Sequence, residues 1–311
     1  MTVNGSFTVN GNSVTAGAGG GGNAALNGSA FGSGIFSQGA PLTFNPGAGN
    51  TQTISNVVAD GLGQASIALT GSGTLALSGA NTYTGGTTVS GGTLVIGNNS
   101  AVGTGLLSLG AGTTLSFGAG NFTVSNSISI PGDPTVMVSP GATQTITGGI
   151  SDGATPGDIV LTGGGKLVLT GPNGYSGSTT INAGTLALSG FGTIPNSNLV
   201  NLANPGVTFD ISQTTRGASI TTLAGVANSQ VTMGSQTLTL TNASTNFAGS
   251  IQGTGGLSLN GGMQTLSGIN TSIPIVVLLR SMQACWKSMA RSRHRTSPRS
   301  HLAARSRVPV R

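Results

Sequence analysis

Charged side chains are scarce in this chain of 311 residues, where they make up 5% of the sequence. An average soluble domain carries about 25% charged residues, and disordered segments usually have a high net charge. The chain also lacks glutamate, because all five of its acidic residues are aspartates. The composition therefore argues against a generic disordered chain and leaves few groups from which acid–base catalysis could be built.

Cysteine, histidine and tryptophan are absent from residues 1–271 and occur only as Cys285, Trp286, His294 and His301. Without these residues the long first part can form neither a disulfide framework nor a thiolate metal site, and it cannot assemble a Ser-His-Asp triad. The longest apolar run, Ile275–Leu279, is far shorter than the roughly 20 residues of a membrane-spanning helix. The N-terminus shows no basic and apolar signal-peptide pattern.

Positive charge is concentrated after residue 271. Residues 272–311 hold nine lysines and arginines and no acidic residue, whereas residues 1–271 hold five aspartates against Lys166 and Arg216, a net charge of −3. The sequence pI of about 10.8 therefore belongs to the last 40 residues. A nucleic-acid partner inferred from the whole-chain charge would be an artefact of averaging, and none is predicted.

Glycine, by contrast, is abundant, with 55 residues, and it recurs within three similar segments. These internal repeats occupy Gly71–Gly97, Gly163–Gly190 and Gly262–Thr271, and their equivalent asparagines lie 92 and then 97 residues apart: Asn81, Asn173 and Asn270. In each complete copy, leucines alternate with small residues, then a turn-rich stretch carries one aromatic, then two further strands follow. Alternation of this kind is typical of β-strands.

Short strands of 4–6 residues, with alternating apolar residues and punctuated by glycine or asparagine, recur along the whole first part of the chain. A closed β-sandwich usually needs larger apolar anchors, whereas a parallel β-helix has a narrow core that small Val, Leu, Ile, Ala and Thr side chains fill. Glycine and asparagine suit its tight corners. We therefore predict an all-β chain in which residues 1–271 form a right-handed, single-stranded parallel β-helix.

The order of residues in the repeat identifies a family resemblance. The pattern G-x-G-x-L-x-L-S-G-x-N-T-Y-T-G-x-T-x-V-x-x-G-T-L resembles the autotransporter-associated β-strand repeat of type V secreted proteins of Gram-negative bacteria. Gly71–Ile96 fits it nearly completely, Gly163–Leu188 departs at Gly174 and Ser176, and the third copy fits only as far as Thr271. The resemblance implies a β-helical passenger exposed at the cell surface. A signal peptide would precede it and an outer-membrane β-barrel would follow in the parent protein; the chain shows neither.

The third copy stops where its pattern demands tyrosine, and composition changes abruptly there. Glycine disappears after Thr271, and arginine, cysteine, tryptophan and histidine appear. Back-translating Ala284–Arg311 and shifting the reading frame can regenerate passenger-like sequence, including a Gly-Gly-Thr-Leu segment. We interpret residues 272–311 as a frameshifted, non-native, unstructured tail; the alternative is a genuine basic tail that binds nucleic acid or anionic lipid.

Candidate catalytic residues are few. A Ser-Lys dyad could use only Lys166, which begins a predicted strand, where an exposed lysine is the simpler interpretation. Asp152 and Asp158 form the closest acidic pair, but they flank the turn Gly153–Gly157, so turn capping is favoured over a catalytic pair.

Ligand-binding motifs are equally weak. Gly19–Gly22 and Gly163–Gly165 lack the spacing of phosphate loops, and no aspartate follows the calcium-binding nonapeptide pattern. Alternating Thr237, Thr239 and Thr241 could bind ice or carbohydrate, but a water-facing strand rich in threonine is ordinary. We predict no catalytic, cofactor-binding or metal-binding residue and no cofactor.

Three functions remain open. The first is a non-catalytic structural or adhesive passenger segment, a surface stalk whose partners are host surfaces, extracellular matrix or neighbouring cells. The second is a β-helix enzyme, of the polysaccharide lyase or hydrolase type, whose active site lies outside this segment. The third is an inert gene fragment that is not exported.

Overall fold

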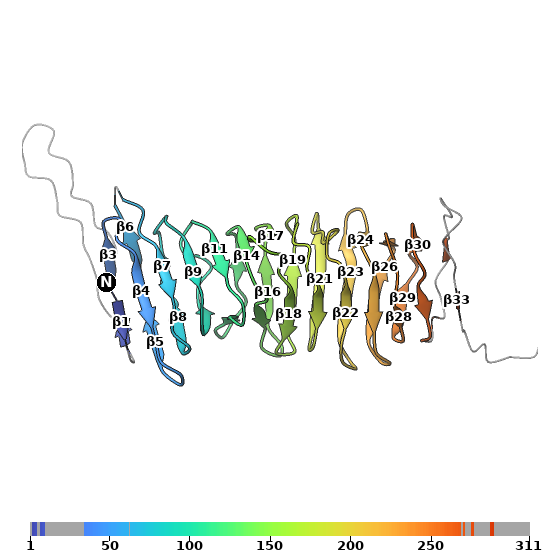
Figure 1. Ribbon diagram of the computed structural model, residues 1–311, viewed down its shortest axis with the longest axis horizontal. Coiled ribbons are helices and arrows are strands. Elements are labelled where there is room, and N and C mark those ends of the chain that lie inside the picture. The colour runs from blue at the N-terminus through green and yellow to red at the C-terminus, as the bar shows by residue number, and fades with distance from the viewer. Residues whose placement is uncertain are drawn as a thin grey trace, which may run out of the picture.

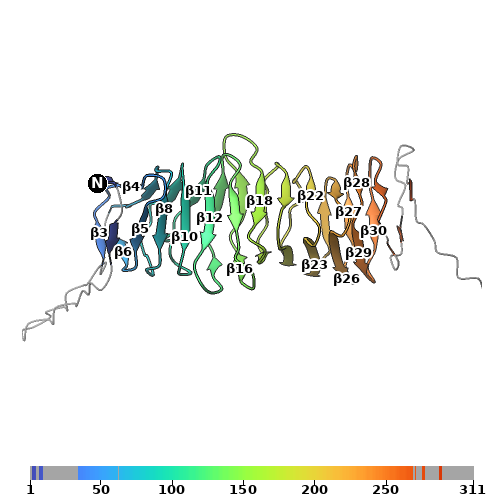
Figure 2. The same ribbon diagram turned by 90° about the horizontal axis from the view of Figure 1, so that it is seen from below.

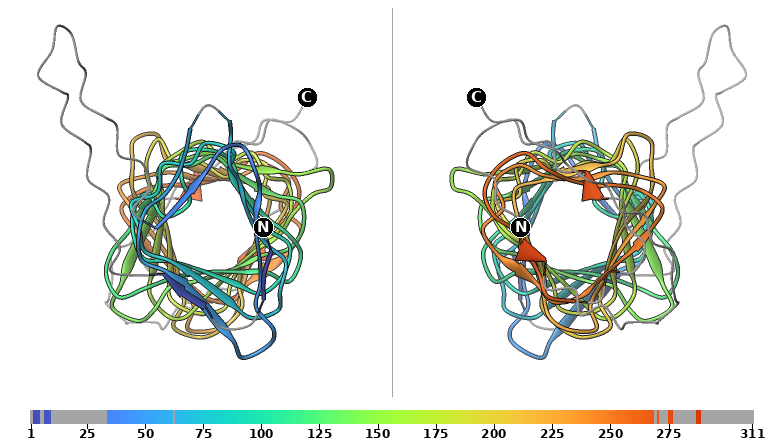
Figure 3. Two further views of the ribbon diagram at one scale, coloured as in Figure 1. Left: turned by 90° about the vertical axis from the view of Figure 1, so that its left-hand side faces the viewer. Right: turned by 90° about the vertical axis from the view of Figure 1, so that its right-hand side faces the viewer.

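The computed structural model describes residues 34–61, 63–268 and 270, together with the strand segments Thr2–Asn4, Phe7–Val9, Ile275–Val276 and Lys287–Ser288. These residues form a rod of short strands stacked along one axis (Figures 1 and 2). Seen end-on, the successive turns superimpose around that axis (Figure 3). No helix occurs among the described residues. The predicted unstructured tail, apart from two two-residue strands, lies outside them.

One sheet of 13 strands, here called the long sheet, runs the length of the rod and receives one strand from each turn. Its order is β2-β5-β8-β10-β12-β15-β18-β20-β22-β25-β28-β31-β33, with parallel pairing throughout. The strands are β2 Phe7–Val9, β5 Thr51–Ile54, β8 Thr74–Leu77, β10 Thr93–Ile96, β12 Thr114–Phe117, β15 Thr135–Met137, β18 Ile159–Thr162, β20 Thr179–Ile181, β22 Val200–Leu202, β25 Leu223–Gly225, β28 Asn246–Phe247, β31 Thr265–Leu266 and β33 Lys287–Ser288.

A second side of the rod precedes most strands of the long sheet, although not β20 or β22, and it consists of two successive sheets. The first contains β1 Thr2–Asn4, β4 Leu42–Asn45, β7 Ile67–Leu69, β9 Thr87–Val89, β11 Leu107–Leu109, β14 Ile128–Ile130 and β17 Ile150–Asp152. The other contains β24 Ala218–Ile220, β27 Leu238–Leu240, β30 Leu257–Leu259 and β32 Ile275–Val276.

A third side follows most strands of the long sheet, although not β8 or β10, and it too is divided in two. A two-stranded sheet pairs β3 Ile35–Ser37 with β6 Val58–Asp60. A seven-stranded sheet contains β13 Thr123–Val124, β16 Thr143–Ile146, β19 Lys166–Leu169, β21 Thr185–Gly190, β23 Thr208–Thr214, β26 Gln230–Gly234 and β29 Ser250–Gly253. The predicted parallel β-helix is thus confirmed for the described residues.

The core follows directly from alternation along each strand. In β8 and β10, Leu75 pairs in register with Leu94, and both are fully buried, while the threonines beside them point outward. Stacking like on like at a strand spacing of about 4.8 Å lets each turn cover the apolar side chains of its neighbour. Each buried leucine contributes about 1.5–3 kcal/mol, so the rod is stabilised turn by turn rather than by one central core.

Two equivalent glycines show why the corners cannot carry larger residues. Gly92 and Gly184 directly precede β10 and β21, the final strands of the two complete repeats, and have φ angles of +65° and +80°. A Cβ atom at either position would lie 2.2 or 2.1 Å from the carbonyl oxygen of Gly73 or Gly165 in the preceding turn. Positive φ and close approach of backbone both favour glycine, which explains the Gly-x-Leu ending of the motif.

Candidate functional site

The repeat turns form the most elaborate polar structure in the described rod. In the first copy the turn at residues 79–86 follows β8 and replaces a strand on the third side. In the second copy the turn at 171–178 follows β19 and replaces a strand on the second side. Each turn places an asparagine and a tyrosine in the interior, where Asn81 and Asn173 are 1% and 2% exposed.

Each asparagine connects its own turn of the solenoid to the solenoid turns before and after it. The Oδ1 of Asn81 accepts a hydrogen bond from the Val58 backbone N–H (2.7 Å), and its Nδ2 donates to the Ala101 carbonyl (2.6 Å). Asn173 likewise accepts from the Ile150 N–H (3.1 Å) and donates to the Thr193 carbonyl (3.0 Å). These bonds satisfy backbone groups that the missing strand would otherwise have paired, because buried polar groups must find partners.

The asparagine of the partial third copy also accepts a hydrogen bond from a backbone N–H of the preceding solenoid turn. Asn270 Oδ1 accepts from the Ile251 N–H at 2.9 Å, and its Nδ2 donates to the Gly268 carbonyl at 3.1 Å. The acceptor contact is therefore common to the three asparagines that the sequence aligns, and the donor contact to the following turn is common to Asn81 and Asn173.

The tyrosine of each turn points inward and is fully buried. The hydroxyl of Tyr83 shares a hydrogen bond with Thr87 Oγ1 (2.5 Å), and that of Tyr175 shares one with Thr179 Oγ1 (2.6 Å). Burial raises the pKa of both tyrosine hydroxyls above the usual value of 10.0, although the threonine bonds act in the opposite direction. These are the two tyrosines of the chain, and each is buried within a repeat turn that contains no strand.

An aspartate in the preceding turn caps each repeat turn from outside. Asp60 Oδ2 accepts hydrogen bonds from the Thr84 N–H (2.7 Å), the Thr84 hydroxyl (2.8 Å) and the Ala65 N–H (3.0 Å). Partial desolvation alone would raise the pKa of this carboxyl. The hydrogen bonds from Thr84 and Ala65 together outweigh it, so the pKa lies below its usual value.

Asp152 performs the same role for the second copy. It accepts from the Ser176 N–H and hydroxyl and from the Gly157 N–H, at distances of 2.7–3.1 Å. Desolvation raises the pKa of Asp152, but the bonds from Ser176 and Gly157 lower it further, with a net decrease. The turn-capping role predicted for Asp152 is confirmed.

The repeat unit is longer than the sequence motif. Asp60 and Asp152 lie 92 residues apart, as do the segments Thr51–Ile54 and Thr143–Ile146, which both read Thr-Gln-Thr-Ile. The buried Gln144 accepts from the Phe122 N–H and donates to the Gly120 carbonyl in the turn before. Our sequence reading missed this upstream half, although the identical tetrapeptides at the same period were a signal that could have revealed it.

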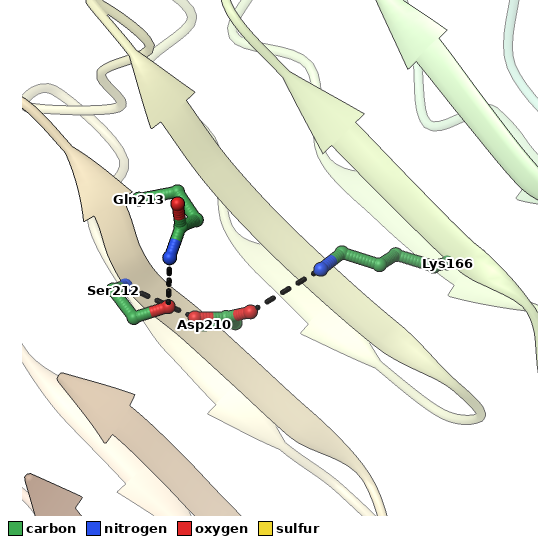
Figure 4. Close-up of polar contacts among 4 residues, drawn as sticks. All are labelled: Lys166, Asp210, Ser212 and Gln213. Atoms are coloured by element: carbon green, nitrogen blue, oxygen red, sulfur yellow. Dashed lines mark hydrogen bonds and ion pairs between the residues drawn. The ribbon is translucent and has the colours of Figure 1, made fainter. Parts of the chain in front are cut away.

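Lys166 is held by a carboxylate on the outer surface of the third side. Its Nζ lies 3.3 Å from Asp210 Oδ2, and the lysine side chain crosses the intervening strand β21 to reach it (Figure 4). Asp210 Oδ1 also accepts from the Ser212 N–H at 3.0 Å. Partial desolvation raises the pKa of Asp210, but the bonds from Ser212 and the nearby ammonium of Lys166 produce a net decrease. The contact of Lys166 shown here is with a carboxylate, not with the serine hydroxyl that a Ser-Lys dyad needs.

The remaining sequence candidates make separate structural contacts. Asp158 Oδ1 accepts from the Ser178 N–H at 2.6 Å, a contact separate from those of Asp152. Thr239 lies on β27 in register with Ser219 and Ser258, so no threonine column forms there. Gly163–Gly165 make a corner between β18 and β19, and Gly19–Gly22 lie outside the described residues.

Larger binding features are sparse in the described ranges. A shallow hollow of about 510 Å³ lies between the loops at residues 117–121 and 139–142, where the long sheet meets the third side. No group of three or more His, Cys, Asp or Glu side chains gathers in the part of the chain that the structure covers. Nor do those residues include a helix long and apolar enough to cross a membrane.

Comparisons with known proteins agree with the repeat geometry. The family model of the passenger-associated-transport-repeat matches residues 69–96 and 159–188, which correspond to the two complete repeats of the sequence. The chain is also 30% identical over 183 residues to the "Adhesin BmaC autotransporter" of Brucella suis biovar 1 (strain 1330). That alignment covers 50% of this chain and 5% of the adhesin, so the chain spans a small fraction of its relative.

No solved structure matches the chain. The resemblance drawn from the sequence is nevertheless confirmed by two matched repeats, by similarity to an autotransporter adhesin and by the solenoid itself. The chain is a parallel β-solenoid in which residues 69–96 and 159–188 match the passenger-associated-transport-repeat, and half of its length is similar to part of an autotransporter adhesin.

Proposed function

We propose that residues 34–270 form a non-catalytic, surface-exposed rod that holds adhesive surfaces away from the cell. The observation that carries this proposal is that buried polar side chains in the described rod bond each turn of the solenoid to its neighbours. Its interior polar groups, such as Asn81 and Asn173, bond neighbouring turns to one another. A rod whose turns are tied together in this way can be long and stiff without a large globular core.

The similarity to an autotransporter adhesin supports exposure and adhesion rather than catalysis. The described acidic groups serve structural roles in the same way: Asp60 and Asp152 cap turns, and Asp210 pairs with Lys166. Catalytic carboxylates of β-helix enzymes must instead converge on a substrate. We extend the proposal to a boundary at residue 271, after which the basic segment 272–311 begins, with the two-residue strands β32 and β33 paired to the end of the rod.

Exposure is tested in the native organism. Antibodies against folded residues 34–270 should label intact cells, and external protease should remove that label while leaving a cytoplasmic marker untouched. Labelling that appears only after the cells are permeabilised would contradict the proposal and favour an unexported fragment.

Adhesion is tested separately with beads coated with the purified chain. Coated beads should bind host cells or extracellular matrix more than beads coated with the Tyr83→Ala/Tyr175→Ala double variant, in which both repeat turns are disrupted. Equal binding by the two coats would show that the folded rod is not the adhesive element.

A further inference from the structure

Phe191 is the most exposed large hydrophobic residue of the described rod. It is 69% exposed, whereas Phe44, Phe209 and Phe247 are at most 1% exposed. It directly follows β21 and lies between Gly190, with a φ of +60°, and Gly192, where a Cβ atom would lie 2.0 Å from the Leu169 carbonyl oxygen. The backbone on either side is therefore fixed against the rod, and the ring is held outside the core.

Arg216 approaches this ring from the next turn. Its guanidinium carbon is 5.9 Å from the centre of the Phe191 ring, within the range of a cation–π contact. The segments that carry Phe191 and Arg216 are joined through Thr215. Its backbone N–H and its hydroxyl both donate to the Gly190 carbonyl, at 2.9 and 3.0 Å. Arginine and aromatic ring thus form one preorganised surface, here called the Phe191–Arg216 corner.

The charge of Arg216 is not neutralised within the described residues. Lys166 and Arg216 are the two basic residues of the chain before residue 272. Lys166 forms the described salt bridge, with Asp210, and Arg216 takes part in none among the residues that the structure covers. An exposed guanidinium keeps donors in a planar fork that matches a carboxylate.

We propose that the Phe191–Arg216 corner binds a sugar acid, that is, a pyranose carrying a carboxylate. The guanidinium would hold the carboxylate through two parallel hydrogen bonds. The ring would pack against the C–H face of the sugar, because those hydrogens are partly positive and the aromatic face is negative. The exposed Thr215 hydroxyl donates its hydrogen to the Gly190 carbonyl, so its oxygen can accept a hydrogen bond from a sugar hydroxyl beside the corner.

The shape of the surface favours a sugar over an acidic peptide. An extended peptide needs a groove or a free sheet edge for its backbone, whereas the corner lies next to β21 and β23, which are paired on both sides. The described hollow lies elsewhere, between residues 117–121 and 139–142. One aromatic ring, one guanidinium and one hydroxyl together suit a single sugar acid.

The inference deepens the adhesive role and rests on it, but binding can be measured on the isolated full-length chain. Trigalacturonic acid, its fully methyl-esterified form and triglutamate are each titrated in 0.15 M salt. The readout is the amide NMR signals of Gly190, Gly192 and Gly217. We expect trigalacturonic acid to shift these signals with saturation, and we expect binding at least roughly tenfold weaker for the neutral ester and for triglutamate.

Matched variants locate the site. Phe191→Ala and Arg216→Gln should each weaken binding of trigalacturonic acid by roughly fivefold or more. Leu106→Ala, at another exposed hydrophobic residue, and Lys166→Gln, which removes the same charge elsewhere, should leave it unchanged. The basic segment 272–311 is present in every variant, so its nonspecific attraction cancels.

Several results would overturn the proposal. Equal affinity for acid and ester would remove the role of Arg216, and equal loss in Lys166→Gln and Arg216→Gln would indicate diffuse electrostatics. Tighter binding of triglutamate would identify an acidic peptide site instead. Saturable binding to the isolated chain without labelling of intact cells would contradict surface exposure while leaving the sugar-acid site intact.

Discussion

The two complete repeats form nearly the same turn on different sides of the rod. Four turns along the long sheet separate β8 from β18, and the second copy begins one side later, on β19. Asn81 and Asn173 nevertheless make equivalent bonds, as do Tyr83 and Tyr175. The conformation is therefore set by contacts that each copy brings with it.

The threonine that bonds each tyrosine has a different second hydrogen-bond partner in the two copies. In the first, Thr87 Oγ1 also donates to the Val102 carbonyl at 3.3 Å. In the second, Thr179 Oγ1 bonds to the buried Ser197 hydroxyl at 2.9 Å, and that hydroxyl reaches the Gly177 carbonyl as well. The turn that follows a repeat can thus vary, whereas the aspartate before it and the asparagine and tyrosine within it recur.

The largest expected effect comes from removing either tyrosine. Tyr83→Ala and Tyr175→Ala should each lower the free energy of unfolding by about 3–5 kcal/mol, because each leaves a large cavity in the interior. Urea unfolding followed by circular dichroism measures the loss, and amide exchange shows whether it is confined to adjacent turns, as expected for a solenoid.

Tyrosine-to-phenylalanine variants are the control, since they remove only a hydroxyl and should cost about 1 kcal/mol. A loss below about 1 kcal/mol for one alanine variant and a full loss for the other would show that the two copies are not equivalent.

Asn81→Ala and Asn173→Ala should be next in size, at about 2–3 kcal/mol each, because buried backbone groups lose their partners. Asn173 makes an additional bond to the Gly171 carbonyl, so its replacement should cost slightly more. The Val58 and Ile150 amides should exchange faster in the respective variants. Unchanged protection of these two amides would mean that the asparagines do not hold the turns together.

Alkaline pH should destabilise both copies together. The folded pKa of each tyrosine is raised, so stability is fully present below the unfolded value of about 10 and is lost as pH rises beyond it. The expected slope is about 1.4 kcal/mol per pH unit for each tyrosine. Absorbance at 295 nm should show the two tyrosines ionising only on unfolding.

The double variant Tyr83→Phe/Tyr175→Phe separates these tyrosines from other groups that titrate at high pH. It should lose the alkaline slope that the tyrosines cause. Ionisation of one tyrosine in the folded protein near pH 10 would show that its turn is open to water.

Acidic pH should have the smallest effect. The folded pKa values of Asp60 and Asp152 lie below 3.8, so their contribution is present above about pH 4 and is lost as pH falls through the folded values. Asp60→Asn and Asp152→Asn should each reduce this acid dependence in denaturation measured from pH 5 to pH 2. An identical acid profile in variant and parent would exclude a capping role for that carboxylate.

Much of the fold could be predicted because the signals are local. Alternation in segments such as Thr93–Ile96 sets the buried face of each strand, and glycines such as Gly92 mark corners that a side chain would block. The asparagine alignment also succeeded, since a buried amide at a fixed place in the motif performs the same bonding wherever it lies.

The side of the rod that each copy occupies could not be predicted. Register shows that Thr74 follows Thr51 by 23 residues while Thr93 follows Thr74 by 19. Because the length of a turn varies, a period of 92 residues does not reveal how many sides it spans. Long-range partners were hidden for the same reason, as with Lys166 and Asp210, which lie 44 residues apart.

The second copy begins one side of the rod later than the first, and this shift has a consequence for how such rods grow over evolutionary time. If a repeat had to keep its side, a duplicated stretch of gene would need to encode whole turns. Here the third side accepts the first copy and the second side accepts the second. A duplicated stretch of gene therefore need not encode a whole number of turns to give a repeat that fits the rod.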